Sequence, residues 1–340
     1  MTILVTGGAG FIGSNFVLDW FANGDEPVVN LDKLTYAGNL GNLASLTNQT
    51  NHTFVRGDIG DGALMARLLE EHRPRAVLNF AAESHVDRSI HGPEDFIQTN
   101  IVGTFHLLEA VRAYYSGLQQ TDRDAFRLLH VSTDEVYGSL PKDDAAFSET
   151  HRYEPNSPYS ASKAASDHLV RAYHHTYGLP VVTTNCSNNY GPYQFPEKLF
   201  PLMVQNAAAG RPLPVYGDGL NVRDWLFVAD HCEALHAALA RGRVGETYNI
   251  GGGAEKTNLE VVTEICAMLD ERLGAPPPAA DGTLRASHRE LITFVRDRPG
   301  HDRRYAVDAS KAELELDWRP RHDFAAGIRA TVDWLSLIHI

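Results

Sequence analysis

Short apolar runs alternate with amphipathic stretches along the first half of the chain. Residues 2–6 (TILVT) are apolar and β-branched and end at Gly7, which predicts a buried strand. Similar runs lie at 27–32, 53–56, 76–80, 127–132 and 180–185. Apolar residues at helical spacing fill the stretches between the runs, at 11–23, 61–72, 95–115 and 159–177. Strands that alternate with helices predict an α/β fold, a doubly wound parallel sheet with helices on both faces.

The pattern changes after residue 187. Residues 188–201 (NNYGPYQFPEKLFP) are rich in Pro, Gly and Tyr and read as a loop. Residues 214–228 indicate a hairpin, or a loop and a strand, and a helix is expected at 230–241. The composition of 275–282 (APPPAADG) is that of a surface linker. We therefore divide the chain into a sheet domain at 1–187 and a second portion at 188–334, part of which is expected to return to the sheet.

The last six residues, 335–340 (LSLIHI), do not continue the helical pattern that ends at Trp334. They back-translate to CTGTCTCTTATACACATC, which resembles a transposon adapter used in sequencing libraries. We expect that the natural chain continues differently beyond Trp334, with a genuine short apolar end as the alternative.

Charge and cysteine content narrow the classes of partner. Lys and Arg number 30 against 43 Asp and Glu, a net charge of −13, so neither nucleic acid nor an anionic membrane is an expected partner. An anionic substrate would need a local cluster of basic side chains.

The three cysteines are widely spaced and the 16 histidines are scattered, which predicts reduced thiols, no metal site and a cytoplasmic protein. No apolar run reaches membrane-spanning length, and we expect no signal peptide.

A glycine motif follows the first expected strand and opens the first expected helix. Gly7, Gly10 and Gly13 allow a tight turn and the approach of a pyrophosphate to the helix N-terminus. Asp32 ends the second strand, where its carboxylate can accept hydrogen bonds from a ribose and would repel a 2′-phosphate. The pattern predicts a dinucleotide site that prefers NAD to NADP. The alternative is a glycine turn with a surface aspartate.

Tyr159 and Lys163 are spaced to lie on one helix face. A nearby ammonium lowers the pKa of a phenol, which makes Tyr159 a candidate base for an alcohol proton. A hydroxyl from Ser132 or Thr133, about 26 residues upstream of Tyr159, completes a catalytic group. A surface Tyr and Lys are the alternative for this spacing alone.

Five further segments carry a family resemblance: NLDKLTYAGN (30–39), AAESHVDRSI (81–90), VSTDEVYG (131–138), NNYGPYQFPEKL (188–199) and DRPGHDRRY (297–305). With the two motifs above, the chain resembles the extended short-chain dehydrogenases/reductases that act on nucleotide sugars, and within them the 4,6-dehydratases. The resemblance runs from residue 2 to about residue 334. It implies a Rossmann-type sheet with a smaller, mixed α/β C-terminal portion that binds substrate. It also implies a homodimer paired through the helices at 95–115 and 159–177.

The resemblance assigns catalytic roles to five residues. Thr133 and Tyr159 meet the sugar 4-hydroxyl, and Lys163 also contacts the nicotinamide ribose. Asp134 and Glu135 reach C6 and C5 of the sugar. The implied reaction converts dTDP-glucose to dTDP-4-keto-6-deoxyglucose and water, with oxidation at C4, elimination across C5 and C6, and return of the hydride to C6. The structural alternative is that Asp134 and Glu135 only form a turn after the strand and have no catalytic role.

The resemblance also implies two binding sets. The NAD set comprises Gly7, Gly10, Phe11, Ile12, Gly13, Asp32, Lys33, Leu34, Thr35, Asp58, Ile59, Ala81, Ala82, Ser84, Thr99, Tyr159, Lys163 and Asn189. The substrate set comprises Ser84, Thr133, Asn188, Lys198, Leu199, Pro214, Tyr216, Arg223, Asn258, Arg298, His301 and Tyr305, with Arg303 and Arg304 nearby. The basic members supply the cluster that a diphosphate requires.

Two other functions stay open at this point. A UDP-glucose 4,6-dehydratase, or another nucleotide-sugar enzyme of the family, would share Thr133, Asp134 and Glu135. A non-catalytic NAD-sensing protein would use the same scaffold, but such proteins typically lose Tyr or Lys from the catalytic pair, and both are present here.

Overall fold

The computed structural model describes residues 1–278 and 282–339. Its centre is a sheet of seven strands, all parallel, in the order β10-β6-β5-β4-β1-β2-β3. The strands are β1 (Ile3–Thr6), β2 (Val28–Asp32), β3 (His52–Arg56), β4 (Ala76–Asn79), β5 (Arg127–Thr133), β6 (Val181–Cys186) and β10 (Thr247–Ile250). The predicted α/β, doubly wound parallel sheet is confirmed.

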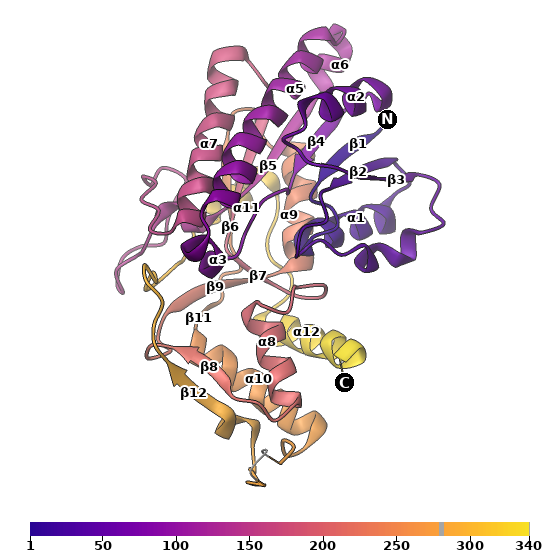
Figure 1. Cartoon of the computed structure of the whole chain (residues 1–340). Coiled ribbons are helices and arrows are strands. Elements are labelled where there is room, and N and C mark those ends of the chain that lie inside the picture. The colour runs from indigo at the N-terminus through magenta and orange to yellow at the C-terminus, as the bar shows by residue number, and fades with distance from the viewer. Residues whose placement is uncertain (279–281, 340) are drawn as a thin grey trace.

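Helices cover both faces of the sheet (Figure 1). One face carries α2 (Gly62–His72), α5 (Thr104–Gly117) and α7 (Pro158–Tyr177). The other carries α1 (Phe11–Asn23), η1 (Leu40–Leu46), α9 (Val228–Arg241) and α11 (Ser310–Leu316). Successive side chains of β1 point to opposite faces of the sheet. Ile3 and Val5 pack in the cluster with α1 and α9, and Leu4 packs in the cluster with α2 and α5.

The helix expected at 95–115 is present, with a π-helical stretch inside it. Its segments are α4 (Glu94–Phe96), the π-helical η2 (Ile97–Gly103) and α5. The wider π turn places Asn100 where it bonds Glu83 and Ser162 Oγ. Three short helices that the pattern did not predict lie nearby: α3 (Val86–His91), α6 (Gln120–Ala125) and η3 (Asp134–Tyr137). They are too short to leave a periodic signal.

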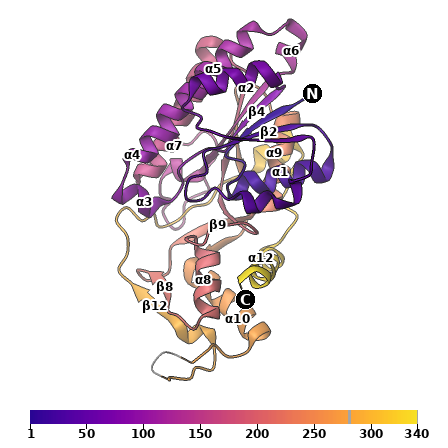
Figure 2. The ribbon, with the colours of Figure 1, turned by 45° about the vertical axis from the view of Figure 1, so that its right-hand side comes forward.

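A second lobe lies beyond one end of the sheet (Figures 1 and 2). It contains α8 (Leu199–Ala208), α10 (Asn258–Leu273), η4 (His288–Leu291) and α12 (Phe324–His339), packed on their own apolar cluster. Its strands are β7 (Asn188–Tyr190), β8 (Leu213–Tyr216), β9 (Val222–Phe227), β11 (Glu255–Thr257) and β12 (Ile292–Val295). Of the two alternatives predicted for 214–228, the hairpin is wrong, because β8 pairs with β12 and β9 pairs with β7 and β11. The loop followed by a strand is present, as the residues before β9 and β9 itself.

The chain returns to the first lobe before it ends in the second. Strand β10 pairs with β6 at the edge of the sheet, and α9 and α11 pack beside it. The helix expected to end at Trp334 continues to His339, because Leu335 is 1% exposed in the cluster of the second lobe. Part of the expected linker, 279–281, and residue 340 of the expected non-native tail lie outside the described residues.

None of the helices described at 1–278 and 282–339 is long and apolar enough to cross a membrane.

Candidate active site

The glycine loop between β1 and α1 has no room for side chains. Gly7 has φ +72°, and a Cβ there would lie 2.7 Å from Ala81 N. A Cβ at Gly13 would collide with Gly7 O. Helix α1 begins after Gly10 without a side-chain cap, so its first N–H groups are free to meet an anion at the cavity wall that Phe11 and Ile12 line.

The Asp32 carboxylate is held at the end of β2. Its Oδ2 accepts from Ala9 N at 2.9 Å and its Oδ1 accepts from Leu34 N at 2.8 Å. Asp32 is 8% exposed, and it lines the same cavity as the glycine loop. Beside it, Lys33 Nζ lies 2.8 Å from Asp58 Oδ2, so the nearest cation is already paired with a carboxylate. An uncapped helix and a fixed acid at the end of β2 fit a dinucleotide without a 2′-phosphate.

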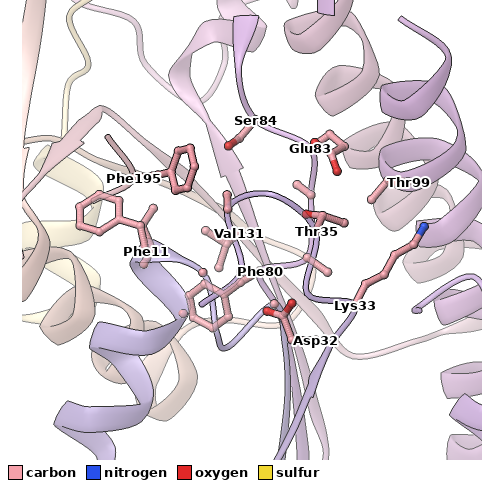
Figure 3. A pocket seen from close by; sticks show the side chains of 18 of the residues that line it. Phe11, Asp32, Lys33, Thr35, Phe80, Glu83, Ser84, Thr99, Val131 and Phe195 are labelled. Atoms are coloured by element: carbon pink, nitrogen blue, oxygen red, sulfur yellow. The ribbon is translucent and has the colours of Figure 1, made fainter. Parts of the chain in front are cut away.

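Figure 3 shows this cofactor cavity, with Phe11 and Phe195 on one side and Lys33 and Thr99 on the other. Two residues of the predicted NAD set do not line it. Leu34 instead supports Asp32 through its backbone N–H, and Asn189 lines the adjoining cavity. The remaining predicted members that line it are Gly7, Gly10, Phe11, Ile12, Gly13, Asp32, Lys33, Thr35, Asp58, Ile59, Ala81, Ala82, Ser84, Thr99, Tyr159 and Lys163.

Tyr159 stands where the cofactor cavity joins a second cavity that reaches into the other lobe. It lies in the first turn of α7, which Ser157 caps by accepting from Ser160 N at 3.0 Å. Of the two candidate hydroxyls, Thr133 lines the second cavity, whereas Ser132 Oγ donates to Asp167 at 2.7 Å. Thr133 is therefore the hydroxyl beside Tyr159.

The sequence predicts that Lys163 lowers the Tyr159 pKa, and the structure contradicts this prediction. Burial raises the Tyr159 pKa well above its ordinary value, and the nearby Glu135 raises it further. Lys163 Nζ donates to Val131 O at 2.8 Å instead of to the phenol. The motif places Tyr159 and Lys163 on one wall of the cavity, but burial dominates the electrostatics of the phenol.

Asp134 and Glu135 follow β5 and lie beside Tyr159 in the second cavity. Asp134 is 1% exposed, and its Oδ2 has no hydrogen-bond partner. Burial, and then the charge of Glu135, raise the Asp134 pKa well above its ordinary value. Burial also raises the Glu135 pKa, but Arg298, Arg223 and Lys198 oppose that rise. The two acids therefore differ in the electrostatics that set their protonation.

Every member of the predicted substrate set lines the second cavity. These are Ser84, Thr133, Asn188, Lys198, Leu199, Pro214, Tyr216, Arg223, Asn258, Arg298, His301 and Tyr305. Arg303 and Arg304 do not line it: Arg303 pairs with Asp218 on the exposed surface, and the largely buried Arg304 side chain pairs with Glu255.

The cations of this cavity are held by the protein itself. Arg223 is 4% exposed, donates to Val222 O and Asp302 O, and stacks on the Tyr305 ring at 4.3 Å. Lys198 Nζ donates to Ser84 O at 2.9 Å. Arg298 Nη1 lies 3.3 Å from Asp87 Oδ1. Cations fixed in this way make a preformed site for a diphosphate.

Several lining residues belong to neither predicted binding set, although all but Trp225 lie inside the segments 81–90 and 188–199 that carry the family resemblance. In the cofactor cavity they include Glu83, Gln194, Phe195 and Glu197, and in the second cavity Asp87 and Trp225. Gln194, Phe195 and Glu197 stand in the loop after β7, where no periodicity distinguishes a lining side chain from a solvated one. Asp87 and Trp225 lie on α3 and β9, within elements whose tertiary neighbours the pattern does not specify.

Within residues 1–278 and 282–339, no group of three or more His, Cys, Asp or Glu is placed to hold a metal ion.

Comparison with known proteins agrees with this geometry. A family model described as GDP-mannose 4,6 dehydratase matches residues 4–331. A dTDP-glucose 4,6-dehydratase of Xanthomonas campestris pv. campestris (strain B100) is 67% identical over 333 residues, 98% of this chain and 92% of the relative. The dTDP-glucose 4,6-dehydratase of Streptomyces venezuelae, solved with NAD and TYD bound, has a TM-score of 0.88 at 48% identity, covering 99% of this chain and 98% of that one. The Bacillus anthracis enzyme of that name, solved with NAD, has a TM-score of 0.85 at 48% identity, covering 99% and 97%.

Proposed function

Because the chain belongs to the family described as GDP-mannose 4,6 dehydratase, we propose that it converts dTDP-glucose to dTDP-4-keto-6-deoxyglucose and water. The protein is an NAD-dependent hydro-lyase. Its relatives over almost the whole chain carry the name dTDP-glucose 4,6-dehydratase, and two similar structures hold NAD.

One observation supports elimination in particular: two acids with different surroundings stand beside Tyr159. Oxidation of a sugar hydroxyl needs only Thr133, Tyr159 and Lys163 around the cofactor. Loss of water needs in addition a base for the C5 proton and an acid for the 6-hydroxyl. Glu135, whose charge is supported by three cations, suits the base, and Asp134, buried and raised in pKa, suits the acid.

Each residue then has one task. NAD, when bound, accepts a hydride from C4 and later returns it to C6. The Tyr159 oxygen takes the proton of the 4-hydroxyl, with Thr133 Oγ1 beside it. The phenol must be ionised to do so, and the positive charge that bound NAD would bring beside it, together with Lys163, would favour that ionisation against the effect of burial. Glu135 removes the C5 proton, which the neighbouring ketone acidifies. Asp134 donates a proton to the departing 6-hydroxyl, so that water leaves. Glu135 returns its proton to C5 as the hydride reaches C6, and the reaction then has no net change of oxidation state.

The second lobe supports the choice of a nucleotide diphosphate. The cavity is lined by four basic side chains, Arg223, Arg298, Lys198 and His301. Guanidinium forks suit the two phosphates, and the buried part of the cavity excludes water from the reacting sugar.

The test is incubation of the purified protein with dTDP-glucose, and separately with UDP-glucose, without added dinucleotide. Mass spectrometry should find loss of water from the dTDP sugar, and borohydride reduction should reveal a new ketone. The proposal fails if neither sugar loses water. Faster loss from UDP-glucose would transfer the assignment to the uridine nucleotide.

We also propose that the protein is a homodimer paired through α5 and α7 with their flanking turns. Ile97, Phe105 and Tyr177 are large apolar side chains that stand 42%, 41% and 50% exposed on these helices. A second copy would cover them. Light scattering should give twice the chain mass, and Phe105→Asp should lower it to one chain; a wild-type monomer would contradict the proposal.

We further propose that the protein works in the cytoplasm. Its three cysteines, Cys186, Cys232 and Cys266, are all free and buried. Free thiols suit a reducing compartment. Fractionation of producing cells should recover the protein with the cytosolic markers, and recovery with the membrane or outside the cell would contradict this.

A further inference from the structure

Three segments that are far apart in the sequence meet at the rim of the cofactor cavity. Tyr36 lies in the loop after β2, Arg88 in α3, and Phe195 and Glu197 in the loop after β7. Glu197 lines the cofactor cavity and the substrate cavity, as do Ser84 and Lys198 from the same two later segments. The meeting point therefore stands over the junction of the two cavities.

Arg88 is the centre of this meeting point. Its Nε lies 2.9 Å from Glu197 Oε2, and its guanidinium carbon lies 3.8 Å from the centre of the Tyr36 ring. The Tyr36 ring in turn meets the edge of Phe195, with centroids 5.5 Å apart. The Arg88 side chain is half exposed and that of Glu197 is 16% exposed, so these contacts lie between the cavity and solvent.

Each segment is fixed to the body of the site at another point. Asn39 N donates to Ala9 O at 2.9 Å, which ties the first loop to the glycine loop. Asn15 Nδ2 donates to Pro192 O at 2.9 Å, which ties the third loop to α1. Lys198 Nζ donates to Ser84 O, which joins the third loop to the segment before α3. With their bases anchored, the side-chain contacts of Arg88, together with the Tyr36–Phe195 ring contact, close the gap between the segments.

The proposed reaction uses one cofactor molecule twice. If the reduced dinucleotide left between the two hydride transfers, the oxidised sugar could not be completed and the enzyme would be left empty. We propose that Tyr36, Arg88, Phe195 and Glu197 form a clasp that keeps the dinucleotide in its cavity throughout the cycle. This inference rests on the proposed function for its purpose, but the retention of the dinucleotide can be measured without it.

Arg88→Met keeps an unbranched apolar stem at this position and removes both the ion pair and the cation–π contact. An exposed ion pair and one cation–π contact are each modest, so their joint loss should speed dinucleotide release on the order of tenfold. After dilution and gel filtration, Arg88→Met should keep less NAD per chain than wild type. Glu197→Gln should do the same, and the double variant should be little worse than either single variant.

A second readout separates retention from a general structural role. During turnover of dTDP-glucose, Arg88→Met should start normally and then lose activity as reduced dinucleotide escapes. A trap that oxidises free NADH should report that escape, and added NAD should restore the rate. Arg88→Lys, which keeps the charge, should lie between Arg88→Met and wild type.

Arg243 provides a matched control. Its Nη2 lies 2.6 Å from Glu315 Oε1, and Tyr248 Oη donates to the other oxygen of Glu315 at 2.8 Å, the same three residue types on a surface that neither cavity reaches. Arg243→Met should retain NAD and keep a linear progress curve.

Equal retention of NAD by Arg88→Met, Glu197→Gln and wild type would overturn the clasp. So would a turnover-dependent loss that added NAD does not restore. If wild type releases no water from dTDP-glucose, the proposed function fails, but the gel-filtration comparison still decides whether the clasp holds the dinucleotide.

Discussion

Asp134 and Glu135 are consecutive in the chain, yet their surroundings prepare them for opposite proton transfers. Asp134 has a buried oxygen without a hydrogen-bond partner, and burial and the charge of Glu135 outweigh the opposing effect of Arg223, which favours the neutral acid. Glu135 faces Arg298, Arg223 and Lys198, which favour the carboxylate. Replacing each acid by its amide should therefore give two distinguishable defects.

Glu135→Gln should stall the reaction after the first oxidation. The side chain keeps its size but cannot take the C5 proton, so bound NADH should accumulate as near-ultraviolet absorbance while water loss falls about 10²- to 10⁴-fold. Asp134→Asn should slow departure of the 6-hydroxyl.

A 6-fluoro substrate, whose leaving group needs less acid assistance, should restore the elimination rate of Asp134→Asn much more than that of Glu135→Gln. Equal rescue of both variants would assign the two acids a structural role.

The raised pKa of Asp134 also predicts how stability depends on pH. The folded chain holds a proton on Asp134 at pH values where the unfolded chain, near 3.8, has lost it. The contribution of Asp134 to the free energy of unfolding is therefore full below the pKa that the group has in the unfolded chain. It falls as the pH rises from there towards the pKa that the group has in the folded chain. Asp134→Asn does not titrate, so its stability relative to wild type should grow with pH, by at most about 1.4 kcal/mol per pH unit.

Urea unfolding of both proteins at about pH 5 and about pH 8 measures that difference. Asp308 gives a control of opposite sign, because hydrogen bonds from Ser310 lower its pKa. Asp308→Asn should lose stability relative to wild type as the pH rises from about 2 to about 5, so this control is measured in that lower range, and its difference from wild type should stay constant between about pH 5 and about pH 8. A difference between Asp134→Asn and wild type that does not change with pH would contradict the raised pKa.

Among the elements, α7 joins local sequence to catalysis most directly. Ser157 and Ser160 cap each other's backbone, and Pro158 occupies the first helical position, so the turn that holds Tyr159 is fixed by its own residues. Such an element can be predicted from sequence, and the helix expected at 159–177 is present.

Ser157→Ala should lower the free energy of unfolding by about 1 kcal/mol. Because the freed turn carries Tyr159, kcat should also fall, on the order of tenfold. Urea unfolding and steady-state kinetics measure the two effects. Asp323→Ala is the matched control, since Asp323 accepts from Ala326 N at 2.7 Å at the start of α12, which lines neither cavity. It should cost similar stability with kcat unchanged; an equal fall in kcat would mean that the Ser157 effect is not local.

Elements whose partners are distant in sequence were predicted less well. The strands of the sheet are apolar on both faces, so their runs identify them, and the substrate set follows from specific motifs. The pairing of β8 with β12 joins residues almost 80 positions apart, and nothing local distinguishes it from a hairpin of β8 with β9. The rim contacts of Arg88 unite three separate loops, and the Tyr159 pKa depends on burial, so neither could be predicted from spacing.

At the scale of the whole molecule, the second half of the chain completes the first lobe. The cluster beneath β5 and β6 includes Leu226, Val228, Leu235, Tyr248 and Ile250, all buried. A chain cut at residue 187 would leave that cluster open to water along α9 and β10.

The fragment 1–187 should therefore not form a stable sheet domain. We expect it to be insoluble or to lack near-ultraviolet circular dichroism, while the intact chain unfolds cooperatively in urea. A soluble fragment with a cooperative transition would show that the first lobe is autonomous.

The position of β10 in the sheet also determines when the sheet can be completed during translation. Strand β6 ends at Cys186 and its edge partner β10 begins at Thr247, so roughly 60 residues must be translated between them. At about 5–20 residues per second, the edge of β6 waits several seconds on the ribosome before its partner emerges. During that interval the nascent chain presents an unpaired strand and an uncovered apolar face, which is the form that chaperones bind. Slower translation over this stretch would lengthen the wait, so the codons between β6 and β10 bear on the yield of folded enzyme.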